Sequence, residues 1–232
     1  MTNKDDFIST VSHEMRTPLT SIRGFAQTML TSWDKLDDTS KKRFLEIIEQ
    51  QSNRLIHLVE NILSVTKISE EKLILKKTDV NTNLNNVIQL IAQKYLEHKI
   101  VTELKNISPI SSDVDRLQQV FLNVIENACK YSEPNTTVTI KTEEENNKII
   151  IKIIDEGTGI EEKHAEKIFE KFARIDNPLT RKIQGSGLGL YITKTLVEKM
   201  NGTISFKNLE KGTEFKIEFP TYNIEEQIKN VV

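Results

Sequence analysis

A histidine beside a carboxylate is the first group in this sequence whose type and spacing fit a chemical reaction. On the predicted first helix, His13 lies about 200° from Val11, so its imidazole points away from the apolar stripe. Glu14 is its neighbour and Thr17 shares its face, while Pro18 offers no N–H to the Glu14 carbonyl, which predicts a kink or loosening over His13. A nucleophilic imidazole needs such a carboxylate to fix its tautomer and take its proton. An ordinary exposed histidine near a proline kink explains the same residues.

Five of the eight glycines lie in two short clusters. One cluster, 155–159, follows a predicted strand, and the other, 185–190, opens a predicted helix. Neither continues with the Lys-Ser/Thr pair of a Walker loop, and the second lacks the Gly-x-Gly-x-x-Gly spacing of a dinucleotide fold. A glycine-rich turn at a helix N-terminus still presents backbone N–H groups to phosphates. Turns use glycine for other reasons as well, but the two clusters together favour a nucleotide site.

A third group of candidate residues lies on the predicted helix 113–132. Its apolar residues form one stripe, and a second face carries Asn123, Asn127, Lys130 and Tyr131. Two asparagines one turn apart weaken a helix, so their presence favours a function for them. An amide oxygen and waters can hold Mg²⁺ against phosphates, while a lysine supplies positive charge. A solvated polar face is the alternative reading of this helix.

The elements that must position these groups differ in their hydrophobic period. Apolar residues recur at spacings of three and four over 7–29 and over 44–65, which predicts two amphipathic helices joined by the polar segment 31–38. Their apolar stripes are too broad for one hairpin to cover. We therefore expect two copies to pair as a four-helix bundle, and the chain to form a homodimer.

From about residue 73 helical and β-rich stretches alternate. Helices are predicted near 81–97, 113–132 and 187–200, and two hairpins pair 136–142 with 148–155 and 203–208 with 213–219. This order predicts a two-layer α/β sandwich, with helices on one face of a mixed sheet.

Composition excludes several classes of protein. The 232 residues fit one or two domains, and a net charge of −2 with 28% charged residues gives no basic excess for nucleic acid. A single cysteine, Cys129, excludes an internal disulfide framework and a cysteine-based zinc cluster. The longest apolar stretch, near 149–154, is far shorter than the roughly 20 residues of a membrane span, and the acidic N-terminus is unlike a signal peptide. We expect a soluble, cytosolic protein.

In combination, these residues resemble the catalytic core of the sensor histidine kinases of two-component systems. The resemblance covers about residues 5–221 and rests on five motifs in the family's order: an H box (7–19), an N box (123–132), a G1 box (155–159), an F box (168–172) and a G2 box (185–190). It implies a dimerisation and phosphoacceptor hairpin over 1–70, a catalytic ATP-binding domain of the gyrase and histidine kinase type over 71–221, and a tail over 222–232.

The resemblance also implies residue roles. His13 is the implied phosphoacceptor, Glu14 the base that activates it, and Thr17 the residue that orients water when a partner is dephosphorylated. Asn127 is the implied Mg²⁺ ligand, and Asp155 the acceptor for the adenine amino group. The implied ATP contacts are Asn123, Asn127, Lys130, Tyr131, Asp155, Gly157, Gly159, Arg174, Gly185, Gly187, Leu188 and Gly189, with 173–184 as a lid over the nucleotide.

The implied function is an ATP-dependent protein-histidine kinase that phosphorylates its own His13, passes the phosphoryl group to an Asp of a response regulator, and has phosphatase activity. The implied location is cytoplasmic, either for a soluble kinase or for the cytoplasmic portion of a membrane sensor, with no membrane or nucleic-acid contact from this segment. A non-catalytic scaffold that dimerises and binds nucleotide is the alternative. An ATP-hydrolysing clamp is disfavoured, because the hydrolases of this superfamily carry a Glu where this sequence has Asn123.

Overall fold

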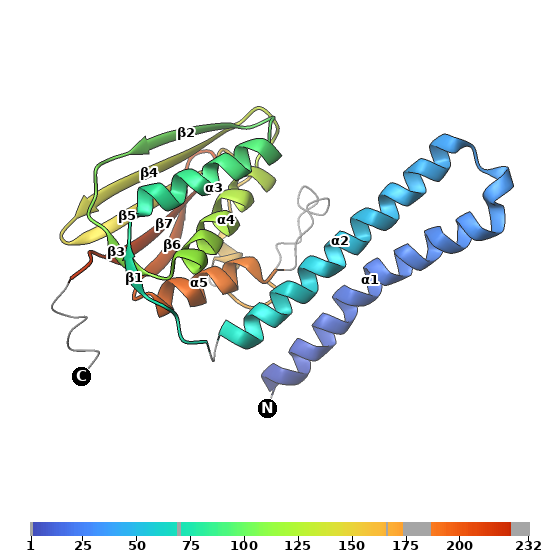
Figure 1. The fold of residues 1–232 in the computed structure, drawn as a ribbon, viewed down its shortest axis with the longest axis horizontal. Coiled ribbons are helices and arrows are strands. Elements are labelled where there is room, and N and C mark those ends of the chain that lie inside the picture. The colour runs from blue at the N-terminus through green and yellow to red at the C-terminus, as the bar shows by residue number, and fades with distance from the viewer. Residues whose placement is uncertain (1, 69–70, 166, 174–186, 224–232) are drawn as a thin grey trace.

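A helical hairpin projects from an α/β lobe (Figure 1). The computed structural model describes residues 2–68, 71–165, 167–173 and 187–223. The order of a hairpin followed by a lobe of helices against a sheet confirms the predicted fold class.

The hairpin consists of α1 (Thr2–Ser32) and α2 (Asp38–Ile68), joined through a short 3-10 turn. Helix α2 begins at a cap, because Asp37 Oδ1 accepts the Ser40 N–H at 2.7 Å. This backbone hydrogen bond, together with a second hydrogen bond from the Ser40 hydroxyl, holds the pKa of the Asp37 carboxyl below its usual value. Helix α1 continues through Pro18, so the expected loosening over His13 does not interrupt the helix.

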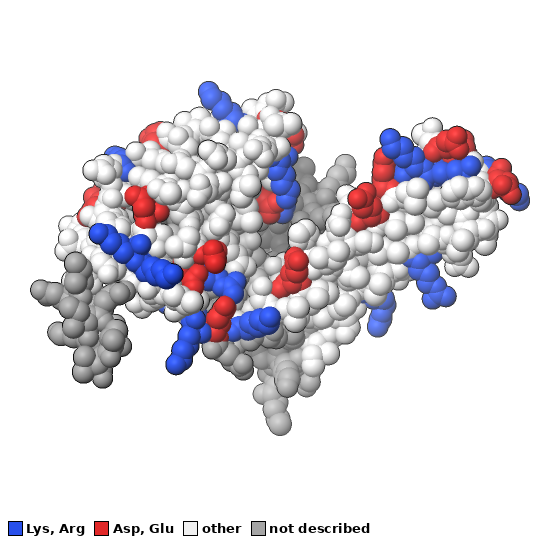
Figure 2. Space-filling model, in the orientation of Figure 1, with Lys and Arg blue, Asp and Glu red and all other residues white. Residues whose placement is uncertain are grey.

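The two helices contact each other along their length but leave much apolar surface uncovered. Phe25 and Phe44 pack with ring centroids 5.0 Å apart. Exposed large apolar side chains follow both helices, at Ile8, Leu19 and Leu30 on α1 and at Leu45, Ile56, Val59 and Leu63 on α2. The three on α1 lie about three helical turns apart, so they share one face. Charged side chains gather at the tip of the hairpin, and the face of its middle seen in Figure 2 is mostly uncharged.

The lobe holds a five-stranded sheet with the order β2-β4-β5-β7-β6, in which only β2 and β4 are parallel among the described strands. Its elements are β1 (Lys76–Thr78), α3 (Val80–Lys94), β2 (Lys99–Leu104), β3 (Ile110–Ser112), α4 (Val114–Lys130), β4 (Thr137–Glu145), β5 (Lys148–Ile154), α5 (Gly189–Lys199), β6 (Thr203–Asn208) and β7 (Thr213–Pro220). Helices α3, α4 and α5 cover one face of this sheet, as predicted (Figure 1). The edge strand β2 and the short β1–β3 pair were not predicted.

Local sequence explains the elements that hold the site. Asn146 and Asn147 have φ of +50° and +61°, the left-handed pair that a tight two-residue hairpin between β4 and β5 requires. Ile151 on β5 and Phe121 on α4 are fully buried in the core, where α4 packs on the sheet. The polar face of α4 is therefore turned away from the sheet.

The hairpin is anchored to the lobe at the end of α2. Val65 and Ile68 are buried as part of the lobe's apolar core. Both carboxylate oxygens of Glu71 accept from Arg116 Nη2 at 2.7 Å, and Lys199 Nζ donates to the Glu71 carbonyl at 3.0 Å. In the described part of the chain, none of the helices combines the length and the apolar character needed to cross a membrane.

Candidate active site

A cleft of about 1250 Å³ lies between the hairpin and the lobe. Glu14 of α1 and Arg54 of α2 form part of its hairpin wall, and the polar face of α4 forms part of the wall opposite. Nine residues singled out in the sequence line this cleft: Glu14, Asn123, Asn127, Lys130, Tyr131, Asp155, Gly159, Gly187 and Gly189. Residues from four separate motifs and from both parts of the chain thus face one space.

The other predicted site residues lie elsewhere. His13 and Thr17 are exposed on α1 and do not line the cleft, although Glu14 between them does. Thr17 Oγ1 donates to the His13 carbonyl at 3.4 Å. Leu188 is fully buried, so its side chain belongs to the core and its backbone alone can approach a ligand. Gly157 does not itself line the cleft but packs against Tyr131 and Asp155, which do, and Arg174 and Gly185 lie outside the described residues.

Asp155 forms the buried end of the cleft, directly after β5, and is 5% exposed. Its Oδ1 accepts the N–H groups of Gly157 at 2.8 Å and Thr213 at 3.1 Å. Burial raises the pKa of the Asp155 carboxyl, and the two backbone hydrogen bonds offset part of that rise. Both bonds use the same oxygen, so the carboxylate retains acceptor capacity for a donor on a ligand.

Glycine is required where the loops close on Asp155. A Cβ on Gly157 would lie 2.4 Å from the Tyr131 carbonyl oxygen. A Cβ on Gly212 would lie 1.9 Å from the Asp155 carbonyl oxygen, and Gly212 also has φ of +85°. Sequence reasoning assigned Gly212 no site role, although its place in the turn before Thr213 was the signal for it.

Two asparagines of α4 have different surroundings. Asn123 Nδ2 donates to the Gly189 carbonyl and to Thr193 Oγ1, both at 3.4 Å, and so links α4 to the start of α5. The side-chain amide of Asn127 lines the cleft and has no hydrogen-bond partner among the described residues. An amide side chain on the cleft wall can offer its oxygen to Mg²⁺, an ion that is held by few protein ligands and keeps several waters.

Glu126, which received no role from the sequence, lies at the centre of a charged cluster on the same wall. Lys130 Nζ is 2.9 Å from Glu126 Oε2. Lys94 Nζ donates to the other oxygen, Oε1, and the Tyr95 hydroxyl donates to Oε1 as well, at 3.2 Å. Burial by itself raises the pKa of the Glu126 carboxyl, but the bonds and charges of the two lysines outweigh it, so the pKa lies below its usual value. Burial, then the charge of Glu126, raises the pKa of Tyr95. These groups hold Glu126 ionised.

Glu14 is also paired. Its Oε2 lies 3.3 Å from Arg54 Nη2, across the hairpin and 40 residues along the chain. Nothing in the local sequence pointed to Arg54. Cys129 is not a competing nucleophile, because burial raises the pKa of its thiol to about 12 and keeps it protonated at neutral pH.

Comparison with known families and proteins agrees with these two parts. A family described as the His Kinase A (phospho-acceptor) domain matches residues 3–71. A family described as the histidine kinase-, DNA gyrase B-, and HSP90-like ATPase matches residues 112–223. The sensor protein SrrB of Staphylococcus aureus is 33% identical over 227 residues, which cover 94% of this chain and 38% of SrrB. The chain thus spans well under half of that relative's length.

Solved structures of histidine kinases share the fold. The Acinetobacter baumannii kinase AdeS matches with a TM-score of 0.70 at 25% identity, over 91% of this chain and 98% of AdeS. The kinase ThkA, in complex with the response regulator protein TrrA, matches with a TM-score of 0.77 at 26% identity, over 94% of this chain and 61% of that one. Full-length ShkA, in complex with AMPPNP, matches with a TM-score of 0.67 at 26% identity, over 94% of this chain and 46% of ShkA. The chain belongs to the sensor histidine kinases and carries both their phosphoacceptor domain and their ATPase-type domain.

Proposed function

We propose that this chain is an ATP-dependent protein-histidine kinase that phosphorylates His13 and passes the phosphoryl group to an Asp of a response regulator. The observation that carries the proposal is the cleft, which has Glu14 of the phosphoacceptor helix on one wall and Asn127 and Asp155 on the other. The AMPPNP complex of ShkA supports ATP as the nucleotide, and the complex of ThkA with TrrA supports a response regulator as the partner.

The lobe provides a site with two ends. Buried Asp155 accepts the adenine amino group at one end, where Gly157 and Gly159 let the backbone come close and Tyr131 lies at the rim. At the other end Gly187 and Gly189 open α5, whose N-terminus favours phosphate. Asn123 of α4 contacts the start of α5 at that end. The resemblance adds Lys130, Arg174, Gly185 and the backbone of Leu188 as phosphate contacts.

Asn127 is the proposed ligand of Mg²⁺. When bound there, the ion would neutralise part of the negative charge of the nucleotide's phosphates. The side chains of the site bind and orient the nucleotide, and Lys130 offsets charge on the transferring group.

In the first reaction, one imidazole nitrogen of His13 attacks the γ-phosphorus in line. A nitrogen–phosphorus bond forms, the bond from phosphorus to the bridging oxygen breaks, and ADP leaves with that electron pair. Glu14 takes the proton from the other imidazole nitrogen, and Arg54 holds the Glu14 carboxylate in place. Because His13 does not line the cleft in this conformation, transfer requires a shift of the lobe along the hairpin or the lobe of a second copy.

In the second reaction, a carboxylate oxygen of the response regulator attacks the phosphorus, and the phosphoryl group leaves His13. His13 is exposed on α1, which leaves it open to a docked partner. Thr17, one turn further, is the proposed residue that positions water when the partner is dephosphorylated.

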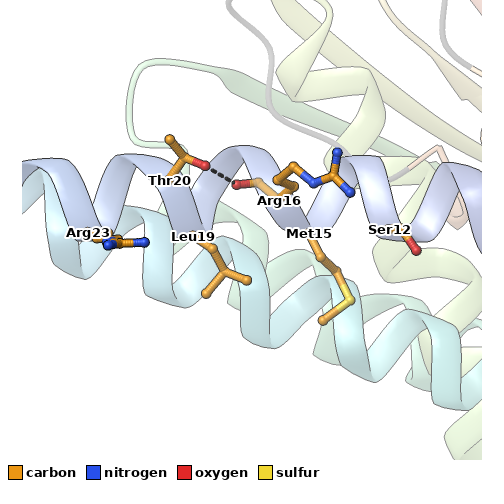
Figure 3. Close-up of a pocket in the computed structure, with 6 residues that line it drawn as sticks. All are labelled: Ser12, Met15, Arg16, Leu19, Thr20 and Arg23. Atoms are coloured by element: carbon orange, nitrogen blue, oxygen red, sulfur yellow. Dashed lines mark hydrogen bonds between the residues drawn. The ribbon is translucent and has the colours of Figure 1, made fainter.

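The open apolar face of the hairpin supports the proposed homodimer. Met15 and Leu19 project from one side of α1 into a groove of about 320 Å³, between Ser12 and Arg23 (Figure 3). A second hairpin on this face and on the exposed apolar residues of α2 would complete a four-helix bundle. The proposed domains are the bundle hairpin over 1–70, the ATP-binding domain over 71–221 and a tail over 222–232.

Incubation with γ-labelled ATP and Mg²⁺ tests the proposal. We expect label on the protein that is lost in acid and retained in base, and absent in His13→Gln. His98→Gln is the control, because His98 does not line the cleft and its ring nitrogen is in a hydrogen bond with Thr136. A scaffold that only binds nucleotide would load ATP and give no label.

A further inference from the structure

The charged cluster around Glu126 places two lysines on one carboxylate at the cleft. Lys94 comes from the last turn of α3 and Lys130 from the last turn of α4, and both line the cleft with Glu126 and Tyr95. The side chain of Glu126 is 18% exposed, that of Lys130 32% and that of Lys94 62%. Two cations and one anion leave the cluster with one net positive charge.

This arrangement poses a problem for a phosphate site. Lys130 is the proposed phosphate contact, yet it is bonded to Glu126. If Lys130 turned to a phosphate and nothing else neutralised Glu126, a carboxylate with several of its lone pairs unsatisfied would remain half-buried beside a polyanion. Part of the gain from the new contact would then be lost to repulsion.

The geometry of the donors solves this problem. Lys130 bonds Glu126 at Oε2, whereas Lys94 and the Tyr95 hydroxyl both bond Oε1. When Lys130 leaves Oε2, Oε1 therefore keeps a cation and a hydroxyl donor. Lys94 and Tyr95 are neighbours at the end of α3, so one rigid element supplies both.

We propose that Lys94 is a positioning residue for the nucleotide: it stays on Glu126 as the counter-charge and so releases Lys130 to the phosphates of ATP. This inference rests on the proposed function and adds a residue that none of the five motifs contains. Lys94 acts through Glu126 and makes no phosphate contact of its own. Its loss should therefore matter only while Glu126 carries a charge.

Binding measurements on the full chain, with ATP and with adenosine in Mg²⁺ buffer, test the proposal. In Lys94→Ala, Glu126 has only Lys130 as a cation, so we expect ATP affinity to fall about tenfold, the effect of one charge-assisted hydrogen bond. Adenosine affinity should not change, because the Asp155 end is untouched. In Lys94→Ala with Glu126→Gln, ATP affinity should return to within about threefold of wild type.

Lys207→Ala is the matched control. Lys207 is also 62% exposed and pairs at 3.0 Å with the nearly buried Glu214, but neither residue lines the cleft. We expect ATP and adenosine affinities like those of wild type.

Three results would overturn the inference while leaving the proposed function intact. One is unchanged ATP affinity in Lys94→Ala. Another is a double variant as weak as Lys94→Ala, which would mean that Lys94 contacts phosphate directly. The third is an equal loss of adenosine and ATP affinity, which would indicate a structural role. A wild-type chain that binds neither ligand would overturn the proposed function and this inference together.

Discussion

The hairpin and the lobe differ in how far they bury their apolar and functional side chains. The lobe closes its own core, with Leu117, Phe121 and Ile151 fully buried, and it buries Asp155, which we propose to recognise the nucleotide. The hairpin exposes His13 and leaves large apolar side chains such as Leu30, 85% exposed, on its surface. A binding site needs rigid, buried partners, whereas a group that must meet both a nucleotide and a second protein needs access.

This difference separates what each part of the chain should control. Changes in the lobe should alter nucleotide binding without affecting self-association. Changes in the hairpin should alter phosphoryl transfer or dimerisation without affecting nucleotide binding. Variants in each part of the chain test that separation.

The largest effect should come from the lobe. Asn127→Ala removes the proposed metal ligand, so we expect phosphorylation from Mg²⁺-ATP to fall to background, beyond about 10³-fold. Labelling with γ-labelled ATP measures this, and gel filtration should show an unchanged oligomer. Asn86→Ala, at an exposed position of α3, is the control for asparagine removal in a helix. Undiminished labelling of Asn127→Ala would refute the metal assignment.

The hairpin's counterpart is Glu14→Gln, which keeps the size of the side chain and removes the base. Autophosphorylation should slow by roughly 10²–10⁴, the usual range for a general base. ATP affinity should stay at the wild-type value, because the nucleotide contacts are on the lobe. Single-turnover labelling at saturating ATP gives the rate, and a full-speed variant would remove Glu14 from the mechanism.

Self-association should depend on the apolar face of α2. Ile56→Glu with Leu63→Glu places charges at two exposed apolar positions, and dimer affinity should fall by about 10²–10³, the cost of burying an unpaired charge. Sedimentation across a concentration series measures the change. Phe121→Ala, in the core of the lobe, should instead lower the stability of the lobe by about 3–5 kcal/mol and leave the affinity of the dimer unchanged. Dimers of unchanged affinity in the Glu variant would place the interface on another face.

The smallest effect should come from Asp155→Asn. Asn keeps an oxygen that can accept from Gly157 and Thr213, so the lobe should fold, while the affinity for ATP falls about tenfold with the lost charged acceptor.

Because the folded-state pKa of Asp155 is raised, its ionisation disfavours the folded state as pH rises above about 4. Between about pH 4 and neutrality, Asp155→Asn should therefore lose less stability than the wild-type protein, as measured by thermal unfolding. A steeper loss of stability with rising pH in the variant than in wild type would contradict the raised pKa of Asp155.

The sequence predicted the elements and groups whose signal is local. Neighbouring residues were enough to predict the spacings of three and four in the two hairpin helices, the β-hairpin that pairs 136–142 with 148–155, and the order of the five motifs. Strand β2 was missed because it is a half-exposed edge strand whose parallel partner, β4, comes after a crossover.

The residues missed at the site depend on contacts between distant segments. Arg54 reaches Glu14 across 40 residues, and Lys94 reaches Glu126 from another helix. Glu126 received no role from the sequence because its surroundings are set by α3, a separate helix. The turn that holds Gly212 was visible in the sequence, but the close approach of this turn to the Asp155 carbonyl depends on a distant segment and was not.

The most direct test locates the phosphoryl group in a protein that is known to be loaded with nucleotide. Stoichiometric Mg²⁺-ATP is added, the bound nucleotide is quantified, and peptides prepared at alkaline pH are sequenced by mass spectrometry. We expect phosphate on His13 and on no other residue of the chain, with ADP formed in equal amount. Full nucleotide occupancy with His13 unmodified, or with phosphate on a different side chain, would contradict it.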